Sequence, residues 1–371
     1  MDLQYLHFLQ NIREQGGEFW ERFFVFITEL DVNPFVLFLI PCVLFWCLSK
    51  QSGQIVFFTY NVGTCLNTIL KNAICCKRPF VRDATLHPSA LTARPNNYSF
   101  PSGHSTIAVN IFGSAGWVIR NKYKVLTWCL WIFVALVLFS RNYLGAHTPQ
   151  DVLVALINGI IIIGIAELLF KYLKEHPEKD NIVFYYGLGI VVLLYAYTIL
   201  KYVVFKSYPA FEVTQVKPLT SMTDNLRAIG GFFGFVLGWY LERKFVNFKD
   251  PEKISLSEKW ARFVVGAIIV AVFVFMIFPV LKHFVWYRPI QFFIQNMLCL
   301  FFIPLTFKGI STWFELTPNL KLTPKKTLLD NIYDFFNGEE NKNKEQREEK
   351  EGKKENTKYR KNKLKNPHVK K

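Results

Sequence analysis

The chain has 371 residues, of which 51% are hydrophobic and 17% aromatic, and its mean hydropathy is +0.19. A soluble domain of this size usually carries less apolar material, so the composition excludes an ordinary water-soluble globular protein. The formal net charge is +16, but the Lys and Arg residues do not form a folded basic module, which argues against nucleic-acid binding.

Residues 1–30 are predicted to form one or two amphipathic helices at the membrane interface, broken at Gly16-Gly17. A transmembrane helix here is less favoured, because Glu21 and Arg22 would lie in its middle at a cost of about 3 kcal/mol each. No basic region precedes an apolar core, so we predict no cleavable signal peptide.

Apolar stretches then recur along the chain, and a run of about 20 apolar residues crosses a bilayer as a helix. We count roughly nine, the seventh being short: 33–50, 54–75, 104–120, 125–141, 151–171, 183–205, 227–241, 261–282 and 289–307. The sequence therefore predicts an all-α polytopic transmembrane bundle. We expect a first group of spans at 31–175 and a second at 181–310.

The second predicted span ends in the pattern Lys-x6-Arg-Pro, formed by Lys71, Arg78 and Pro79. Residues seven apart lie two turns apart on one helix face, and Pro79 is predicted to end that helix. Two cations that face the same way near the membrane surface suit an oxyanion. Taken alone, Lys71 is better explained by a side chain that snorkels to the interface.

The third span opens on Pro101-Ser102-Gly103-His104. Ser102 is predicted to cap the helix, and its hydroxyl and the Gly103 amide can donate to a phosphate at the positive end of the helix dipole. Gly103 also keeps side-chain bulk away from that position. The preceding loop 80–100 is expected to shape the entrance to the site.

From His104 to Ser140 there is room for two helices of about 17 residues, joined by the basic turn 120–124. Such a hairpin returns the chain to its starting surface. Residues around His104 and Ser140 are therefore expected to meet on one side of the membrane. Arg141 adds a third cation there, with a guanidinium suited to bidentate binding of oxyanions.

Thr148, Pro149 and Asp151 together form a helix-start signal, with Thr148 as N-cap and Asp151 at the third helical position. Asp151 lies four residues after His147 and can accept the proton on Nδ1, which leaves Nε2 free to attack. A His-x3-Asp pair by itself is more often a structural hydrogen bond. Five further polar motif residues precede this pair along the chain, and their presence favours a catalytic role for His147 and Asp151.

In order, the patterns Lys-x6-Arg-Pro, Pro-Ser-Gly-His and Ser-Arg-x5-His-x3-Asp resemble the signature of the type-2 phosphatidic acid phosphatase superfamily, over roughly residues 30–170. The resemblance implies that His147 is a nucleophile that forms a phosphohistidine, Asp151 its orienting acid and His104 the general acid. It assigns phosphate binding to Lys71, Arg78, Ser102, Gly103 and Arg141. No metal or other cofactor is implied, because carboxylates that suit Mg2+ are missing around the motifs and three cations take that role.

The second group of spans lacks such a polar set. Gly230, Gly234 and Gly238 recur every four residues there, a stripe that favours close helix packing. A functional interpretation of this second group of spans is that it forms a lateral wall or gate that faces lipid.

The C-terminal tail, residues 320–371, is highly charged and predicted to be disordered, in contact with anionic lipid headgroups. With nine spans, the side that holds the tail carries 30 Lys and Arg against 13 on the other side. The positive-inside rule then makes the tail cytoplasmic and the three motifs extracytoplasmic.

These features together predict a metal-independent phosphatase of the cell membrane that acts on lipid phosphates or polyprenyl diphosphates. A phosphotransferase or headgroup-transfer enzyme that uses the same site is one alternative. A non-catalytic lipid-binding or transport protein is another, although the intact His104, His147 and Asp151 argue against it. The sequence leaves the physiological lipid and the oligomeric state open.

Overall fold

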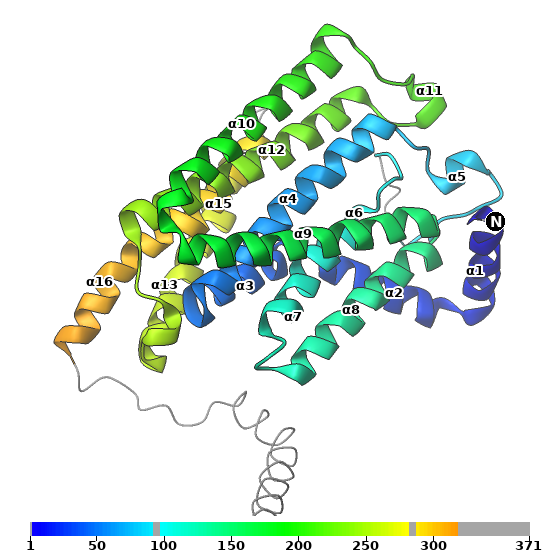
Figure 1. Ribbon diagram of the computed structural model, residues 1–371. Coiled ribbons are helices and arrows are strands. Elements are labelled where there is room, and N and C mark those ends of the chain that lie inside the picture. The colour runs from blue at the N-terminus through cyan, green and yellow to red at the C-terminus, as the bar shows by residue number, and fades with distance from the viewer. Residues whose placement is uncertain (1, 92–96, 282–286, 318–371) are drawn as a thin grey trace, which may run out of the picture. The chain divides into compact units, whose positions relative to one another are not determined.

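The computed structural model describes residues 2–91, 97–281 and 287–317, and every regular element in these ranges is a helix (Figure 1). The first half contains α1 (Asp2–Gly16), α2 (Glu18–Asp31), α3 (Pro34–Val43), η1 (Leu44–Leu48), α4 (Lys50–Ile74), α5 (Pro79–Arg82), α6 (Gly103–Ala108), η2 (Val109–Gly113), α7 (Ser114–Ile119), α8 (Lys124–Tyr143) and α9 (Pro149–Glu175). The predicted all-α fold class is confirmed. The tail 320–371 lies outside the described residues.

The second half continues in the same way. It contains η3 (Pro177–Lys179), α10 (Asp180–Ile199), η4 (Leu200–Val204), α11 (Phe211–Thr214), α12 (Pro218–Leu241), η5 (Glu242–Val246), η6 (Pro251–Lys253), α13 (Leu256–Val272), η7 (Phe273–Ile277), α14 (Phe278–Leu281), α15 (Tyr287–Met297), η8 (Leu298–Phe302) and α16 (Ile303–Leu316).

Fewer helices than predicted have the length and composition of membrane spans. In the described ranges there are five: Lys124–Tyr143, Pro149–Glu175, Pro177–Val204, Leu256–Val280 and Tyr287–Leu316. A sixth is possible if Glu18–Asp31 and Pro34–Leu48, which are bent by 50° where they meet, count as one span. The predicted count of nine is therefore not confirmed.

For one predicted span, 54–75, buried polar side chains account for the difference. Helix α4, predicted as the second span, runs through the bundle between α9 and α12 (Figure 1) and buries several polar residues. The Asn61 amide donates to Asn296 over 2.9 Å, and the Asn72 amide donates to Asn225 over 2.6 Å. Buried amides need such partners, so α4 is polar where it meets other helices and is not a uniformly apolar span.

The N-terminal helices break where the sequence predicts. Helix α1 ends at Gly16, and Gly17 takes a left-handed φ of 77° that suits glycine. Helix α2 then packs against α8, with the rings of Phe24 and Tyr143 4.6 Å apart. One side of α2 is thus buried against protein, a contact that the prediction of an interfacial helix did not contain.

The glycine stripe of α12 packs against another helix. A Cβ added to Gly230 or Gly234 would come within 3.0 Å of backbone atoms of Pro289 and Phe293 on α15. At Gly238 it would meet Leu300 of η8 at 3.1 Å. The stripe therefore brings α12 and α15 close together, as the packing interpretation predicts.

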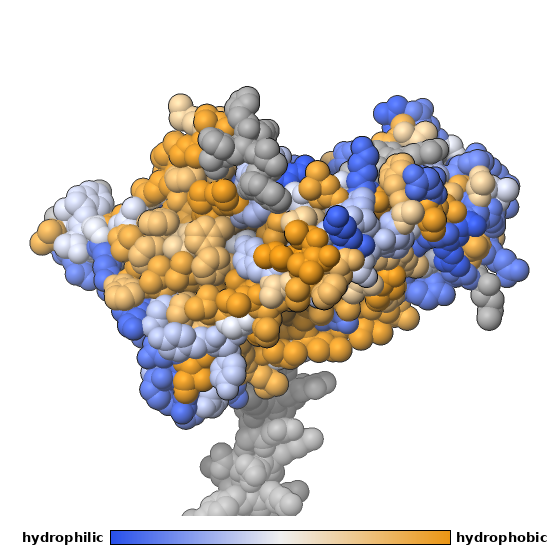
Figure 2. Space-filling view, turned by 90° about the horizontal axis from the view of Figure 1, so that it is seen from above, coloured by the Kyte–Doolittle hydropathy of each residue, from blue (hydrophilic) through white to orange (hydrophobic). Residues whose placement is uncertain are grey.

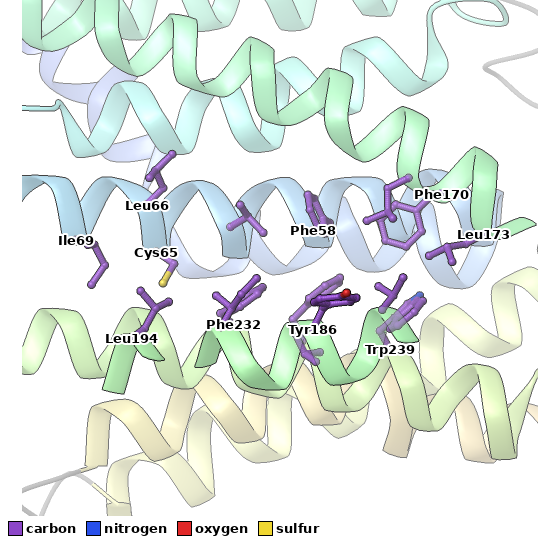
Figure 3. A pocket seen from close by; sticks show the side chains of 17 residues that line it. Phe58, Cys65, Leu66, Ile69, Phe170, Leu173, Tyr186, Leu194, Phe232 and Trp239 are labelled. Atoms are coloured by element: carbon purple, nitrogen blue, oxygen red, sulfur yellow. The ribbon is translucent and has the colours of Figure 1, made fainter. Parts of the chain in front are cut away.

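Apolar side chains cover much of the outside of the bundle. Figure 2 shows them gathered over the middle of one face, with polar residues at its two ends, as expected for a protein that lies across a bilayer. An apolar cavity of about 420 Å3 lies between α4, α9, α10 and α12. Phe58, Phe170, Phe232 and Trp239 are among the side chains that line it (Figure 3).

Candidate active site

The three motifs meet at one end of the bundle, although the first reaches the site differently from the prediction. Helix α4 ends at Ile74 because Cys75 takes a left-handed conformation with φ of 55°. Arg78 therefore does not share a helix face with Lys71. Pro79 holds Arg78 in an extended conformation and begins α5 rather than ending α4.

The helix start after the third motif forms as predicted. The Thr148 side chain accepts from the Asp151 amide, and the Asp151 carboxylate accepts from the Thr148 amide over 2.9 Å, so the two residues form a capping box. The same carboxylate oxygen, Oδ2, lies 3.2 Å from Nδ1 of His147. One side chain thus begins α9 and holds the imidazole, and both His147 and Asp151 are 2% exposed.

Ser99 completes the environment of this carboxylate. Its hydroxyl donates to Asp151 Oδ2 over 2.6 Å. The Ser102 amide donates to the Asp151 carbonyl over 3.0 Å, which joins the second motif to the third. The predicted hairpin therefore does return the chain to one side. Sequence reasoning missed Ser99, because a serine in a long loop gives no periodic or capping signal.

The hydrogen bonds around His147 define its tautomer. A guanidinium only donates, and Nη1 of Arg78 lies 2.8 Å from Nε2 of His147, so Nε2 accepts with its lone pair. Nδ1 then carries the proton and donates to Asp151. Nε2 is the unprotonated nitrogen, and it lies beside the cation that an incoming phosphate would meet.

Electrostatics keep this imidazole neutral. Burial, and then the positive charges of Arg78, Lys71 and Arg141, lower the pKa of His147 well below its usual range. His147 lies in the turn between α8 and α9. A neutral imidazole at neutral pH is the form that attacks phosphorus.

Lys71 holds the loop that precedes α6. Its ammonium donates to the carbonyls of Tyr98, Ser99 and Pro101 at 2.9, 3.1 and 2.6 Å. All three protons of the ammonium therefore have acceptors in this structure. Lys71 contributes charge to the site and positions Ser99, which in turn contacts Asp151.

Helix α6 also begins as the sequence predicts. Ser102 is the N-cap, and its hydroxyl oxygen accepts from the Ser105 amide. A Cβ added to Gly103 would meet only Asn67, at 4.0 Å, so the space beside Gly103 is open. Asn67, a residue that sequence reasoning missed, donates to the Ser102 carbonyl and to Thr106, and so ties α4 to α6.

Arg141 is held by the N-terminal part of the chain. Its Nη1 donates to the Thr28 hydroxyl over 2.5 Å, and Arg141 is 4% exposed. Asp31 is fully buried one turn further along α2, and neither of its carboxylate oxygens has a hydrogen-bond partner in the described part of the chain. No pattern in the sequence indicates that α2 lies beside the site.

A cavity of about 510 Å3 joins these groups. Six of the eight predicted residues line it: Lys71, Arg78, Gly103, His104, Arg141 and His147. Ser102 and Asp151 lie behind the lining and support it. The volume is within the usual range for small-molecule sites. Three motif cations and two histidines around one cavity suit the binding of an oxyanion with an imidazole nitrogen beside it.

Comparison with known proteins agrees with this chemistry. Residues 53–175 match the PAP2 superfamily, and residues 226–312 match a family described as PAP2 superfamily phosphatase, transmembrane extension. The chain is 37% identical over 143 residues to an undecaprenyl-diphosphatase of Bacillus subtilis, an alignment that covers 37% of this chain and 68% of that protein. The chain belongs to the PAP2 superfamily.

Two further relatives carry phosphatase names. A phosphatidylglycerophosphatase B of Bacillus subtilis is 25% identical over 163 residues, which cover 41% of this chain and 76% of that protein. A lipid A 4'-phosphatase of Porphyromonas gingivalis is 36% identical over 82 residues, which cover 22% of this chain and 34% of that protein. No solved structure is significantly similar to this chain.

Membership of the PAP2 superfamily and the apolar helices together make this chain a phosphatase-family protein that is integral to a membrane. All eight candidate residues, from Lys71 to Asp151, lie within the matched range 53–175. The N-terminal residues Thr28 and Asp31 lie outside it.

Proposed function

We propose that this PAP2 member is a metal-independent membrane phosphatase that hydrolyses lipid phosphates or polyprenyl diphosphates through a phosphohistidine on His147. One observation carries the proposal. Nε2 of His147 lies 2.8 Å from Nη1 of Arg78, and both residues line the cavity, while Asp151 holds the opposite nitrogen of the ring. Lys71, Arg78 and Arg141 line the same cavity and would neutralise the charge of the phosphate.

In the proposed first step, phosphate binds among Lys71, Arg78 and Arg141 and takes over the Arg78 donor that now contacts His147. Nε2 of His147 attacks phosphorus. The bond from phosphorus to the leaving oxygen breaks, and its electron pair stays on that oxygen. His104, which takes up a proton when the dianionic phosphate binds, gives that proton to the leaving oxygen. In the second step, water attacks the phosphorus and gives a proton to His104. The bond from phosphorus to Nε2 of His147 breaks, its electron pair returns to Nε2, and inorganic phosphate leaves.

Headgroup transfer remains the second candidate, because the same intermediate would pass its phosphoryl group to an alcohol in place of water. The two reactions share every residue named here. They differ only in the acceptor, so product analysis with and without an added alcohol separates them.

The substrate is expected to be a long-chain lipid. The cavity lies at one end of an apolar bundle, so a phosphate can bind there while its hydrocarbon remains in the bilayer. Each buried CH2 adds about 0.8 kcal/mol to binding where it leaves water. We therefore expect kcat/KM for phosphatidic acid or a polyprenyl diphosphate to exceed that for glucose 6-phosphate by several orders of magnitude.

Phosphate release by the purified protein in detergent micelles, against a panel of lipid and water-soluble esters, measures this. A substrate pair with the same headgroup and shortened chains serves as the control for headgroup preference. Equal efficiency on glucose 6-phosphate would contradict the lipid assignment and favour a sugar-phosphate phosphatase.

We further propose that the site faces the extracytoplasmic side and the tail the cytoplasm, on the Lys and Arg distribution. Ala84, in the loop after α5, and Asn121, in the turn between α7 and α8, are both exposed and well suited to test this. In a background that lacks the seven native cysteines, Ala84→Cys should react with an impermeant thiol reagent on intact cells, and Asn121→Cys should not. The reverse pattern would invert the orientation.

A further inference from the structure

The cavity has a fourth cation that belongs to none of the motifs. Asp224 and Arg227 of α12 line the same space as His147 and the motif cations. Arg227 lies within the part of the chain, 226–312, that matches the transmembrane extension. Resting on the proposed function, we propose that Arg227 binds the second phosphoryl group of a diphosphate lipid and makes diphosphates the preferred substrate class.

The guanidinium of Arg227 retains donors for a ligand. Its ion-pair partner among the described residues is Asp224, at 3.8 Å, which is beyond hydrogen-bonding distance. Its guanidinium carbon also lies 5.4 Å from the centre of the Phe292 ring. The Arg227 side chain is 32% exposed, whereas the motif cations Arg78 and Arg141 are each 4% exposed as whole residues. Arg227 is thus the accessible cation of the cavity.

The motif cations have other contacts. The Lys71 ammonium already donates to three carbonyls, and Arg141 donates to Thr28. Arg78 donates to Asn97 and to the carbonyl of Ala146. These groups surround the phosphoryl group that faces His147, and Arg227 adds a further positive charge to the cavity from α12.

Two contacts fix that wall. The Asn72 amide donates to Asn225 and to the Ser221 carbonyl, so the start of α12 is joined to the end of α4 at the level of Lys71. Thr68 and Thr64 of α4 also line the cavity. They lie about one and two turns from Lys71 along α4, so the cavity continues from the motif cations along this helix.

This arrangement suits the breakdown of a diphosphate. Nε2 of His147 attacks the terminal phosphorus, and the bond from that phosphorus to the bridging oxygen breaks. The electron pair stays on the bridging oxygen, which becomes a terminal oxygen of the departing lipid monophosphate. Arg227 then faces the group on which negative charge grows, where a preorganised cation stabilises the transition state. Asp224, 3.8 Å from Arg227, is a counter-charge of this guanidinium.

The test compares farnesyl diphosphate with farnesyl monophosphate, which share one hydrocarbon chain. We expect Arg227→Gln to lower kcat/KM for the diphosphate by about 10- to 100-fold, the usual effect of a lost hydrogen bond to a charged group, and to change that for the monophosphate by less than about threefold. Arg227→Lys should restore part of the diphosphate activity. Lys217→Gln is the control for loss of a surface cation, because Lys217 is an exposed residue at the N-cap of α12 outside the cavity lining.

A binding measurement separates this inference from the proposed function. Calorimetry with methylenediphosphonate and methylphosphonate should show that Arg227→Gln weakens the first about 10-fold and leaves the second unchanged. Equal losses on both ligands and both substrates, or no loss on either, would overturn the role of Arg227. A wild-type protein that hydrolyses neither ester would refute the phosphatase proposal, while the diphosphonate titration would still decide the role of Arg227.

Discussion

His147→Gln is expected to lower kcat for lipid phosphate hydrolysis by about 10^4-fold or more, because glutamine cannot form the covalent intermediate. The side chain is buried between Asp151 and Arg78, and no other side chain places an unprotonated nitrogen between such partners in the ranges 2–91, 97–281 and 287–317. Phosphate release measures the loss. Rapid quenching with labelled substrate should trap an acid-labile, base-stable phosphoprotein in the wild type and none in the variant.

The histidine controls make this result specific. His87→Gln changes an exposed histidine in the loop after α5 and should leave activity unaltered. His104→Gln should slow esters with poor leaving groups more than those with good ones, since only the former need a proton on the leaving oxygen. Folded His147→Gln protein with near-normal turnover would rule out the covalent mechanism.

Asp151→Asn is expected to have the second-largest effect, a fall in kcat of about 10^3- to 10^4-fold. In the wild type, Oδ2 of Asp151 accepts from His147, from Ser99 and from the Thr148 amide. An asparagine amide that faces Nδ1 would favour the tautomer with the proton on Nε2, which cannot attack. Because asparagine is neutral, it also no longer stabilises the positive charge that develops on the imidazole. Steady-state kinetics with a long-chain substrate measures the effect.

Ser99→Ala is a milder variant that weakens the support of the same carboxylate. It removes one donor to Asp151 and leaves the charge in place, so we expect a fall in kcat of about 10-fold with little change in KM. Asp151→Glu would not serve, because the longer side chain would also disturb the capping box with Thr148. An Asp151→Asn protein that keeps more than a tenth of wild-type kcat would show that His147 does not depend on this carboxylate.

Local sequence patterns determined a large part of the site. Thr148, Pro149 and Asp151 specify a helix start through contacts within four residues, and the structure has that capping box. Ser102 caps α6 for the same reason. The length of the hairpin between His104 and Arg141 brought the second and third motifs together, because two helices of similar length return the chain to one side. Such features depend on neighbours along the chain and are readable without the fold.

Other features were decided only by tertiary structure. Helix α4 ends at Ile74 because Cys75 turns left-handed where the chain leaves the bundle, so Arg78 reaches His147 from an extended segment. The polar residues of α4 pair with Asn296 and Asn225 on helices more than 150 residues away, and the apolar stretches of the sequence do not reveal this pairing.

The remaining contributions to the site come from segments that are distant in sequence. Ser99 donates to Asp151, 52 residues away in sequence, and Thr28 accepts from Arg141, 113 residues away. Arg227 lines the cavity from α12. None of these side chains has a local signal, since a lone serine, threonine or arginine is usually solvated or snorkelling. The sequence by itself determined the chemistry of the motifs. Packing of α2 and α12 against the motif helices decided which further side chains share their cavity, because only close approach of separate helices removes those groups from water and gives them partners.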